Sequence, residues 1–331
     1  MRFTRVSNNP FISKTPGSFF SRLVANPDVV EFDEILYFFF RGQDEFGHDQ
    51  IGVWTKPASE ADGINWDKEI TDPVIRVSEN QDEYDSNHVL DPAAVVFNNQ
   101  IYLYYTAKSN KEVNNHSIGL AISPDGKSFR KIAQNPILYE AIAPEVLIRD
   151  SIFYMFFQRH NLREDCWEIF LRTSEDGIEF SEETEKVVIC WSKIKEELSL
   201  KSIATIRIFQ NNGFYYMTYG ACEKFLDYPE NFKIARSSDL YNWEFSKGES
   251  ILSRGEIGQW DEGAIWYPTI HKVRDKFFMW YEGAGTGNGA LDESAQRACQ
   301  VARNENYGGY LVTSFSQVGV ATLDESEFTW T

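Results

Sequence analysis

Short apolar runs recur along the chain, and each is followed by a turn signal and a second run rich in aromatic residues. In the stretch from Tyr84 to Ala107, YDSNHVLDPAAVVFNNQIYLYYTA, an Asp-Pro pair opens the first run and Asn-Asn separates it from the second. β-Branched and aromatic residues bounded by such a turn favour strands. The pattern therefore predicts a β-hairpin with the carboxylate of Asp91 at its entry.

The same hairpin pattern occurs five times. Aligned on the proline, the copies are NPDVVEFDEILYFFF from Asn26, DPAAVVFNNQIYLYY from Asp91, APEVLIRDSIFYMFF from Ala143, TIRIFQNNGFYYMTY from Thr205 and YPTIHKVRDKFFMWY from Tyr267. Their spacing of roughly fifty to sixty-five residues is typical of a solenoid or radial array. Each copy leads into a third run such as IGVW (Ile51–Trp54) or IGLAIS (Ile118–Ser123), a turn rich in Asp and Gly, and a closing run. Four antiparallel strands in each of five units predict an all-β, five-bladed β-propeller.

The repeats leave two stretches outside the pattern. Residues 1–25 are expected to form an irregular N-terminal arm, and residues 283–315 a polar, glycine-rich insertion in the last blade. Within that insertion, Ser294 to Arg303 favours a short helix, and an insertion of this length in a compact domain is more often a functional lid than disorder. Nothing resembles a linker, so one domain is expected over residues 1–331.

Composition narrows the class of partner. The 331 residues include 25 Phe, 16 Tyr and 9 Trp, which suits a β-rich fold, and the formal net charge of −18 argues against a nucleic-acid partner. Cys166, Cys190, Cys222 and Cys299 lack CxxC spacing and are expected to be buried thiols. The N-terminus has no apolar leader segment, and no stretch approaches the ~20 apolar residues that span a bilayer. We therefore expect a cytoplasmic protein without a membrane partner.

Hairpin geometry predicts where a site would form. The first strand of each hairpin begins where the second ends, so the polar residues at these ends should meet at one opening of the central channel. The expected opposing pairs are Asn26 with Arg41, Asp91 with Thr106, Ala143 with Gln158, Thr205 with Gly220, and Tyr267 with Glu282. Just inside them lie Asp28, Ala93, Glu145, Arg207 and Thr269.

Charge at such an opening is informative, because the packing of a structural repeat is expected to need only its apolar positions. Unlike polar groups crowded at the end of a channel indicate a ligand site. The alternative is that Asp28, Asp91 and Glu145 only cap turns or pair with arginines of the same ring.

Further candidates lie on the loop that enters the last blade, WDEGAIWYP. Glu262 is expected to lean over the opening, and the alternative is a solvated loop acid. Trp266 and Tyr267 suit stacking against a sugar ring, although core packing explains them nearly as well.

These motifs together resemble the five-bladed propeller glycosidases and glycoside phosphorylases, which include glycoside hydrolase families 43, 32, 68, 117 and 130. The resemblance rests on the (N/D)P, LDP and APEV blade starts, the IGLAISPDG third run and the return strand ending FFFRG, and it spans about Asn26 to Trp330. In those families an acid in the first blade is the base or nucleophile, an Asp-Pro aspartate in a nearby blade modulates pKa or orients the sugar, and a glutamate in a later blade donates the proton. The resemblance implies that Asp91 is the Asp-Pro aspartate and Glu145 the acid of the third blade.

The first blade departs from families 43 and 32, which have aspartate where this chain has Asn26. An amide serves neither as nucleophile nor as base, so either Asp28 or another acid replaces it, or the chemistry resembles family 130. That family is similar in its NP-type first blade and in the arginine at position 41. It also has an arginine soon after the Asp-Pro pair, where this chain has Ala93 and Ala94.

The sequence therefore predicts a glycoside hydrolase. Glycoside cleavage needs a proton donor and, in most such enzymes, a second carboxylate. The expected catalytic residues are Asp91, which is essential, Glu145 or Glu262, which provides the proton, and Asp28, which assists. The expected substrate-binding residues are Asn26, Arg41, Gln158, Arg159, Arg207, Trp266, Tyr267 and Glu282. No cofactor or metal ligand set is predicted, although some relatives hold calcium in the channel and the lone His271 lies on a first strand.

Three alternatives remain open at this point. A glycoside phosphorylase or transferase would use the same opening. A non-catalytic carbohydrate-binding propeller is plausible because the first-blade aspartate is missing. A protein-binding scaffold would instead expose a large apolar patch.

Overall fold

The computed structural model describes residues 1–331 except 69, 110–115, 225, 257, 286–315 and 331. Almost every regular element in it is a strand, and the helical elements are short: η1 (Ala58–Glu60), η2 (Glu182–Thr184), η3 (Lys193–Glu197) and η4 (Glu325–Glu327). The predicted insertion at 283–315, with its helix at Ser294–Arg303, lies outside the described residues apart from its first three. In the described part of the chain, no helix has the length and apolar character needed to cross a membrane.

All five predicted hairpins are present. They are β2 (Leu23–Phe32) with β3 (Ile35–Gln43), β5 (His88–Phe97) with β6 (Gln100–Lys108), β10 (Ile142–Arg149) with β11 (Ile152–Asn161), β14 (Ser202–Asn211) with β15 (Phe214–Cys222), and β19 (Ala264–Val273) with β20 (Lys276–Ala284). A third antiparallel strand follows in each case: β4 (Asp49–Pro57), β7 (His116–Ser123), β12 (Cys166–Ser174), β16 (Asn231–Ser237) and β21 (Gln317–Asp324). The hairpin and third strand read from the sequence are therefore present in every copy of the repeat.

The predicted fourth strand is shorter than expected. Only β13 (Lys186–Ile189) exceeds two residues; the second unit has β8 (Arg130–Lys131) and β9 (Leu138–Tyr139), and the fourth has β17 (Glu244–Phe245) and β18 (Leu252–Ser253). In the first unit the fourth position is reduced to the bridges Ile51–Ile75 and Thr55–Asp67. Outer strands of this kind face solvent on one edge, so little packing holds them in long ladders.

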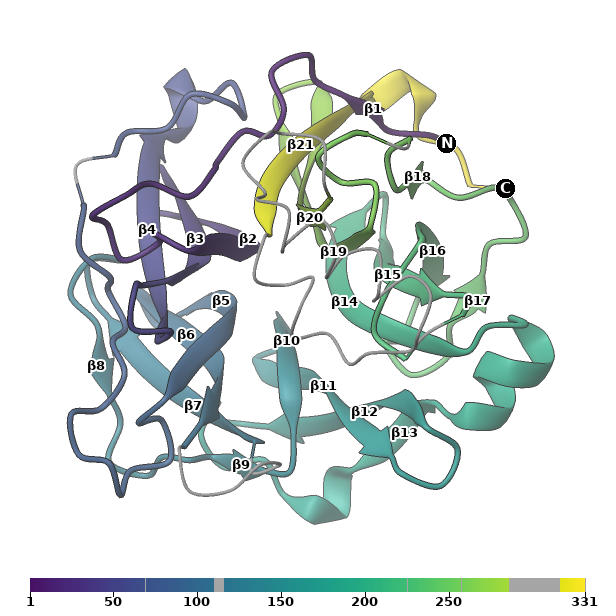
Figure 1. Ribbon diagram of the computed structural model, residues 1–331. Helices are drawn as coiled ribbons and strands as arrows, with labels where there is room; N and C mark the ends of the chain where they lie inside the picture. The colour runs from purple at the N-terminus through teal and green to yellow at the C-terminus, as the bar shows by residue number, and fades with distance from the viewer. Residues whose placement is uncertain (69, 110–115, 225, 257, 286–315, 331) are drawn as a thin grey trace.

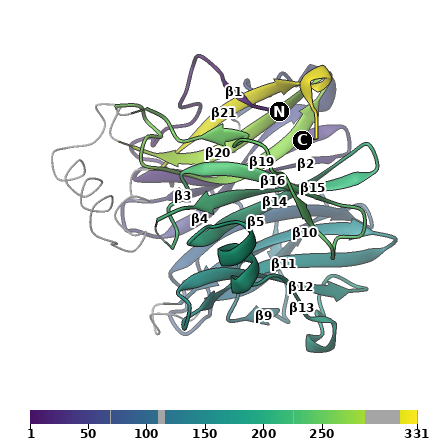
Figure 2. The ribbon, with the colours of Figure 1, turned by 90° about the vertical axis from the view of Figure 1, so that its right-hand side faces the viewer.

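The N-terminal arm is not wholly irregular, which corrects the prediction for residues 1–25. β1 (Thr4–Arg5) pairs with β21, and Ile12 bridges to Val318. β2 already begins at Leu23. The free edge of β21 offers unpaired backbone groups, and the arm satisfies them. The two ends of the chain therefore lie close together at one side of the molecule (Figures 1 and 2).

The five first strands surround a common centre. β2 contacts β5, β5 contacts β10, β10 contacts β14, β14 contacts β19, and β19 contacts β2 again. Figure 1 shows these strands at the middle of the molecule and the short outer strands at its periphery. Residues on the inner strands therefore meet across the centre even when they are far apart in sequence.

The core lies between neighbouring units and follows the same cyclic order. Tyr37 and Phe39 pack with Leu103 and Tyr105 between the first and second units. Equivalent clusters fill each following gap. Phe38 and Phe40 pack with Trp280 and Val320 between the last unit and the first. Alternate residues of one strand thus serve two different interfaces, as the period of a strand requires.

The cysteine prediction holds in part. Cys166 and Cys222 are buried free thiols, whereas Cys190 is only half-buried because it lies just after β13 at the molecule's outer edge. Cys299 lies outside the described residues.

Candidate functional site

A β-bulge interrupts each first strand at the residue aligned before the proline position. These residues have positive φ: Asn26 48°, Asp91 55°, Ala143 50°, Thr205 46° and Tyr267 53°. The pairing register shifts at the same points. Non-glycine residues adopt this conformation at a cost in free energy, so five of them at matched positions form a shared architectural feature.

The bulge moves the predicted pairing by one residue. Arg41 lies opposite Ala25, not Asn26, and Glu282 lies opposite Trp266, not Tyr267. The same offset occurs in the other three hairpins. The extra residue of the bulge, invisible in the sequence pattern, accounts for the difference.

Bulges also leave backbone N–H groups that need acceptors, and the preceding hairpin supplies them. Thr106 Oγ1 accepts from Ala143 N at 2.8 Å, and Gln158 Oε1 accepts from Thr205 N at 3.1 Å. The expectation that packing needs only apolar positions is therefore wrong at the channel opening, because an unpaired buried N–H is costly. Gln158 has a structural role whether or not it also touches a ligand.

Asp91 and Tyr267 form a hydrogen bond across the opening. The Tyr267 hydroxyl donates to Asp91 Oδ1 at 2.5 Å. Their strands, β19 and β5, are not neighbours in the ring. Burial raises the pKa of Asp91, while the hydrogen bonds from Tyr267 and Thr106 and the charges of Arg41 and Arg207 oppose that rise. The bond therefore places a desolvated carboxyl group at the centre of the opening.

Glu282 lies beside Asn26 at the same level. Glu282 Oε2 accepts from Asn26 N at 3.3 Å and from Asn26 Nδ2 at 3.2 Å, and Oε1 accepts from the Ser316 hydroxyl. Burial raises the pKa of Glu282 to about 7; the Asp91 carboxylate adds to this and Arg41 opposes it. Glu282 on β20 therefore lies beside Asn26 on β2, the position at which the related families have an aspartate.

Arg41 is held in place by Asn26 and by two residues that the sequence did not point out, Asp49 and His88. Its Nε donates to Asp49 Oδ1 at 2.6 Å, and its Nη1 donates to Asn26 Oδ1 at 3.4 Å. His88 Nδ1 lies 2.6 Å from the other oxygen of Asp49. Burial would raise the pKa of Asp49, but Arg41 and His88 outweigh it and the pKa is lowered. Asp49 therefore carries a negative charge that fixes the guanidinium.

Asp227 is a third carboxyl group at the opening and was also missed. It lies on the loop between β15 and β16, and Trp266 Nε1 donates to its carbonyl oxygen at 3.2 Å. Burial raises the pKa of Asp227 to about 7, and the charges of Glu282 and Asp91 contribute. The repeat pattern gave no signal for it, because this loop lies outside the repeated strands. We call Asn26, Arg41, Asp91, Asp227, Tyr267 and Glu282 the mouth group.

A second polar layer lies deeper in the channel, two residues further along the strands, which is roughly 6–7 Å. Arg207 donates to Pro92 O at 2.9 Å, Pro144 O at 3.2 Å, Thr269 Oγ1 at 3.2 Å and Glu145 Oε2 at 3.2 Å. Its guanidinium also lies 4.9 Å from the centre of the Tyr267 ring. We call Asp28, Glu145, Arg207 and Thr269 the deep group.

Both acids of the deep group bind backbone amides of the next hairpin. Asp28 accepts from Ala94 N at 2.7 Å, and Glu145 accepts from Ile208 N at 2.7 Å. Burial raises the pKa of Glu145 to about 8 although Arg207 opposes it, and burial likewise raises the pKa of Asp28. The alternative raised from the sequence, that an acid of the ring only pairs with an arginine, describes the contact of Glu145 with Arg207.

Two predicted residues have their contacts elsewhere, and a third is covered by protein. Arg159 donates to Glu185 at 2.9 Å and to Glu140 O at 3.1 Å in its own unit. Glu262 accepts from Gly258 N within its own loop. Trp266 is only 3% exposed, so its indole ring contacts protein.

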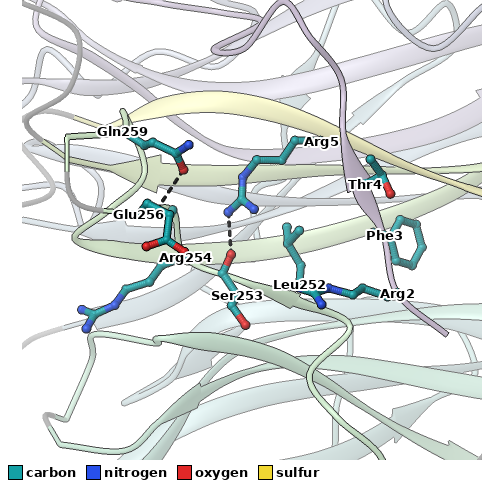
Figure 3. Close-up of a pocket in the computed structure, with 10 residues that line it drawn as sticks. Arg2, Phe3, Thr4, Arg5, Leu252, Ser253, Arg254, Glu256 and Gln259 are labelled. Carbon is teal, nitrogen blue, oxygen red and sulfur yellow. Dashed lines mark hydrogen bonds between the residues drawn. The ribbon is translucent and has the colours of Figure 1, made fainter.

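A separate pocket of about 360 Å³ lies at the periphery, between β1 and β18. Figure 3 shows its arginines, of which Arg5 donates to Ser253 O and pairs with Asp261 at 2.6 Å. Arg254 donates to Gly263 O at 3.0 Å. These internal bonds engage Arg5 and Arg254, and the pocket is separate from the mouth group.

Among the described residues, no group of three or more His, Cys, Asp or Glu side chains is arranged to hold a metal ion. The expectations about cofactors and a structural calcium ion stay predictions.

Comparison with known proteins places the fold in a structural class. No protein-family model matches the chain, and no curated protein matches its sequence. Among solved structures, a GH43_1 enzyme from Xanthomonas citri complexed with xylose is similar at 16% identity, over 97% of this chain and 91% of that one, with a TM-score of 0.66. An N-acetylgalactosamine deacetylase from F. plautii, in complex with blood group B trisaccharide, matches at 12% identity over 99% of both chains, with a TM-score of 0.68. A putative glycosidase from Bacteroides thetaiotaomicron matches at 14% identity over 99% and 97%, with a TM-score of 0.67.

At these identities the likeness concerns the fold. The chain has the β-propeller fold of the family 43 glycoside hydrolases and related carbohydrate-active proteins. The resemblance read from the sequence is confirmed at that level.

Proposed function

We propose that the protein is a glycoside hydrolase built on a five-bladed β-propeller, with its active site at the mouth group. The observation that carries the proposal is the contact across the opening between Tyr267 and Asp91, with two further carboxyl groups and Arg41 beside it. The five bulged hairpins in cyclic contact support five blades, each with three full strands and a reduced fourth.

In this proposal Asp91 accepts the proton of the water that attacks the sugar. Tyr267 and Thr106 hold its carboxylate in place. Arg41, Asn26 and Glu282 bind sugar hydroxyls, since together they offer donors and acceptors close to Asp91. Paired carboxyl groups in different environments divide the work of base and acid.

The deep group is proposed to support the mouth group. Glu145 accepts a hydrogen bond from the Ile208 amide and Asp28 accepts one from the Ala94 amide, while Arg207 lies against the Tyr267 ring. We therefore move the role of proton donor away from Glu145, and equally away from Glu262, whose carboxylate binds its own loop. Gln158 and Arg159 are likewise proposed to act in the fold.

A substrate panel tests the function. Aryl and natural glycosides, furanosides as well as pyranosides, are incubated with the protein with and without inorganic phosphate. We expect release of free reducing sugar that phosphate does not change. Formation of a sugar phosphate would instead identify a phosphorylase, and saturable sugar binding without product would identify a binding propeller.

A second function is favoured by one specific observation. Asn26 stands where the families 43 and 32 have an aspartate, and the F. plautii protein of the same fold is a sugar deacetylase. Incubation with N-acetylated sugars, read by acetate release, distinguishes the two. Acetate without cleavage of any glycosidic bond would replace the hydrolase proposal.

A further inference from the structure

We propose that Asp227 protonates the departing oxygen of the glycoside. This inference rests on the proposed function and adds a catalytic residue that neither the repeat pattern nor the family resemblance singled out.

The loop that carries Asp227 is fixed on the last hairpin. Trp266 Nε1 donates to the Asp227 carbonyl oxygen at 3.2 Å, and Ile265 N donates to Pro229 O at 3.1 Å. The Tyr228 ring meets the Trp266 ring edge-on, with centroids 5.9 Å apart. These contacts lie directly before the bulge at Tyr267. They hold the backbone of Asp227 in a defined place relative to Asp91, as a proton donor requires.

The three residues differ in exposure. Asp91 and Glu282 are 3% and 2% exposed, whereas Asp227 is half-buried. In a channel mouth, the sugar whose bond is broken enters first and the leaving group remains toward solvent. Asp227 is therefore the one of the three that a leaving group reaches, while the other two face the bound sugar.

The surroundings of Asp227 favour its protonated form near neutral pH. Burial is the largest cause, and the charges of Glu282 and Asp91 add to it, so its pKa is raised to about 7. Only the hydrogen bond from Trp266 opposes this rise. In the reaction, the O–H proton of Asp227 passes to the glycosidic oxygen as the C–O bond breaks and its electron pair stays on that oxygen. Water forms the new C–O bond and gives a proton to Asp91, so charge and protons balance.

Leaving-group dependence tests the role. We assay the wild type, Asp227→Asn and the loop control Glu223→Gln on two types of substrate. In glycosides of 2,4-dinitrophenol the leaving group departs without protonation, whereas in disaccharides the leaving sugar must be protonated. We expect Asp227→Asn to lose about 10²–10⁴-fold on disaccharides and to change little on the dinitrophenyl glycosides. The fall in activity above about pH 7 should disappear in the variant, while Glu223→Gln, an exposed acid bonded to Asn231, should match wild type.

Two results would overturn the assignment. An equal loss on both substrate types would make Asp227 a binding or structural residue, and no loss on either would exclude it. A carboxyl-carbon NMR titration without substrate gives an independent readout: Asp227 should titrate near pH 7. If the wild type cleaves no glycoside, the hydrolase proposal is wrong, whatever the titration shows. If Asp227 also titrates near pH 4, the proposal that it is a proton donor is wrong as well.

Discussion

The mouth group and the deep group use the same residue types for different purposes. In the deep group, Glu145 and Asp28 each bind a backbone amide of the next hairpin, and Arg207 binds carbonyls from two strands. In the mouth group, side chains mostly bind other side chains, as Tyr267 does with Asp91. Groups that tie backbone to backbone close the ring, whereas groups held mainly by other side chains are freer to exchange partners with a ligand.

The largest effect that follows from this contrast is expected at Asp91. Asp91→Asn removes the proposed base but keeps the size of the side chain, so kcat/KM should fall about 10²–10⁴-fold with the unfolding midpoint nearly unchanged. The measurement is initial rates on the best glycoside together with thermal unfolding. Retained sugar binding alongside lost turnover would also exclude a non-catalytic binding propeller.

Asp125→Asn is a matched control for that substitution. Asp125 caps a turn outside the channel, where its Oδ1 accepts from Lys127 N at 2.9 Å and Ser128 N at 2.7 Å. It should lower stability without altering kcat/KM. Equal activity losses in the two variants would show that the assay reports folding.

Arg207→Met should act on stability before activity. Above about pH 8, where Glu145 is ionised, the change leaves its carboxylate buried without the counter-charge of Arg207, and breaking a buried pair from one side costs about 3–5 kcal/mol. Urea unfolding measures this. Adding Glu145→Gln should recover part of the loss. If Arg207→Met unfolds like wild type, the deep group does not close the ring.

Tyr267 contacts the deep group through its ring and the mouth group through its hydroxyl, so Tyr267→Phe removes only the second contact. The ring still covers Arg207, but the hydroxyl that donates to Asp91 is lost. A hydrogen bond to a charged group contributes about 1.5–3 kcal/mol, so activity should fall roughly 10- to 100-fold while the fold is kept. The pKa of Asp91 should rise, which moves the acidic limb of the pH profile upward. An unchanged profile would mean that the bond does not act on Asp91.

Much of this arrangement was readable from the sequence because the hairpin repeats. The bulges fall at the five aligned residues, and Asn26, Asp91, Tyr267 and Glu282 do meet at one opening, since strand period and hairpin closure fix where they point. A pattern of apolar positions was enough for that step.

Other members depend on contacts that no repeat encodes. Asp227 lies on a connecting loop, and Asp49 reaches Arg41 from a third strand. The need for Gln158 and Thr106 came from backbone N–H groups that a bulge exposes, and a bulge has no reliable sequence signature. Arg159 was predicted to bind substrate but pairs with Glu185, which lies within reach of its long side chain.

The smallest expected effect is on the pH dependence of stability, and its sign differs between the channel and the turns. Glu145, with its pKa raised to about 8, favours the folded state when protonated, so its contribution is full below its unfolded pKa and is lost as pH rises toward 8. Asp125, with its pKa lowered to about 2, contributes stability that is lost only as pH falls through that value. Between pH 6 and pH 9 the melting temperature should therefore decline less in Glu145→Gln than in wild type, and Asp125→Asn should keep the wild-type slope. Parallel curves for all three proteins would show that Glu145 is ionised throughout, with Arg207 outweighing its burial.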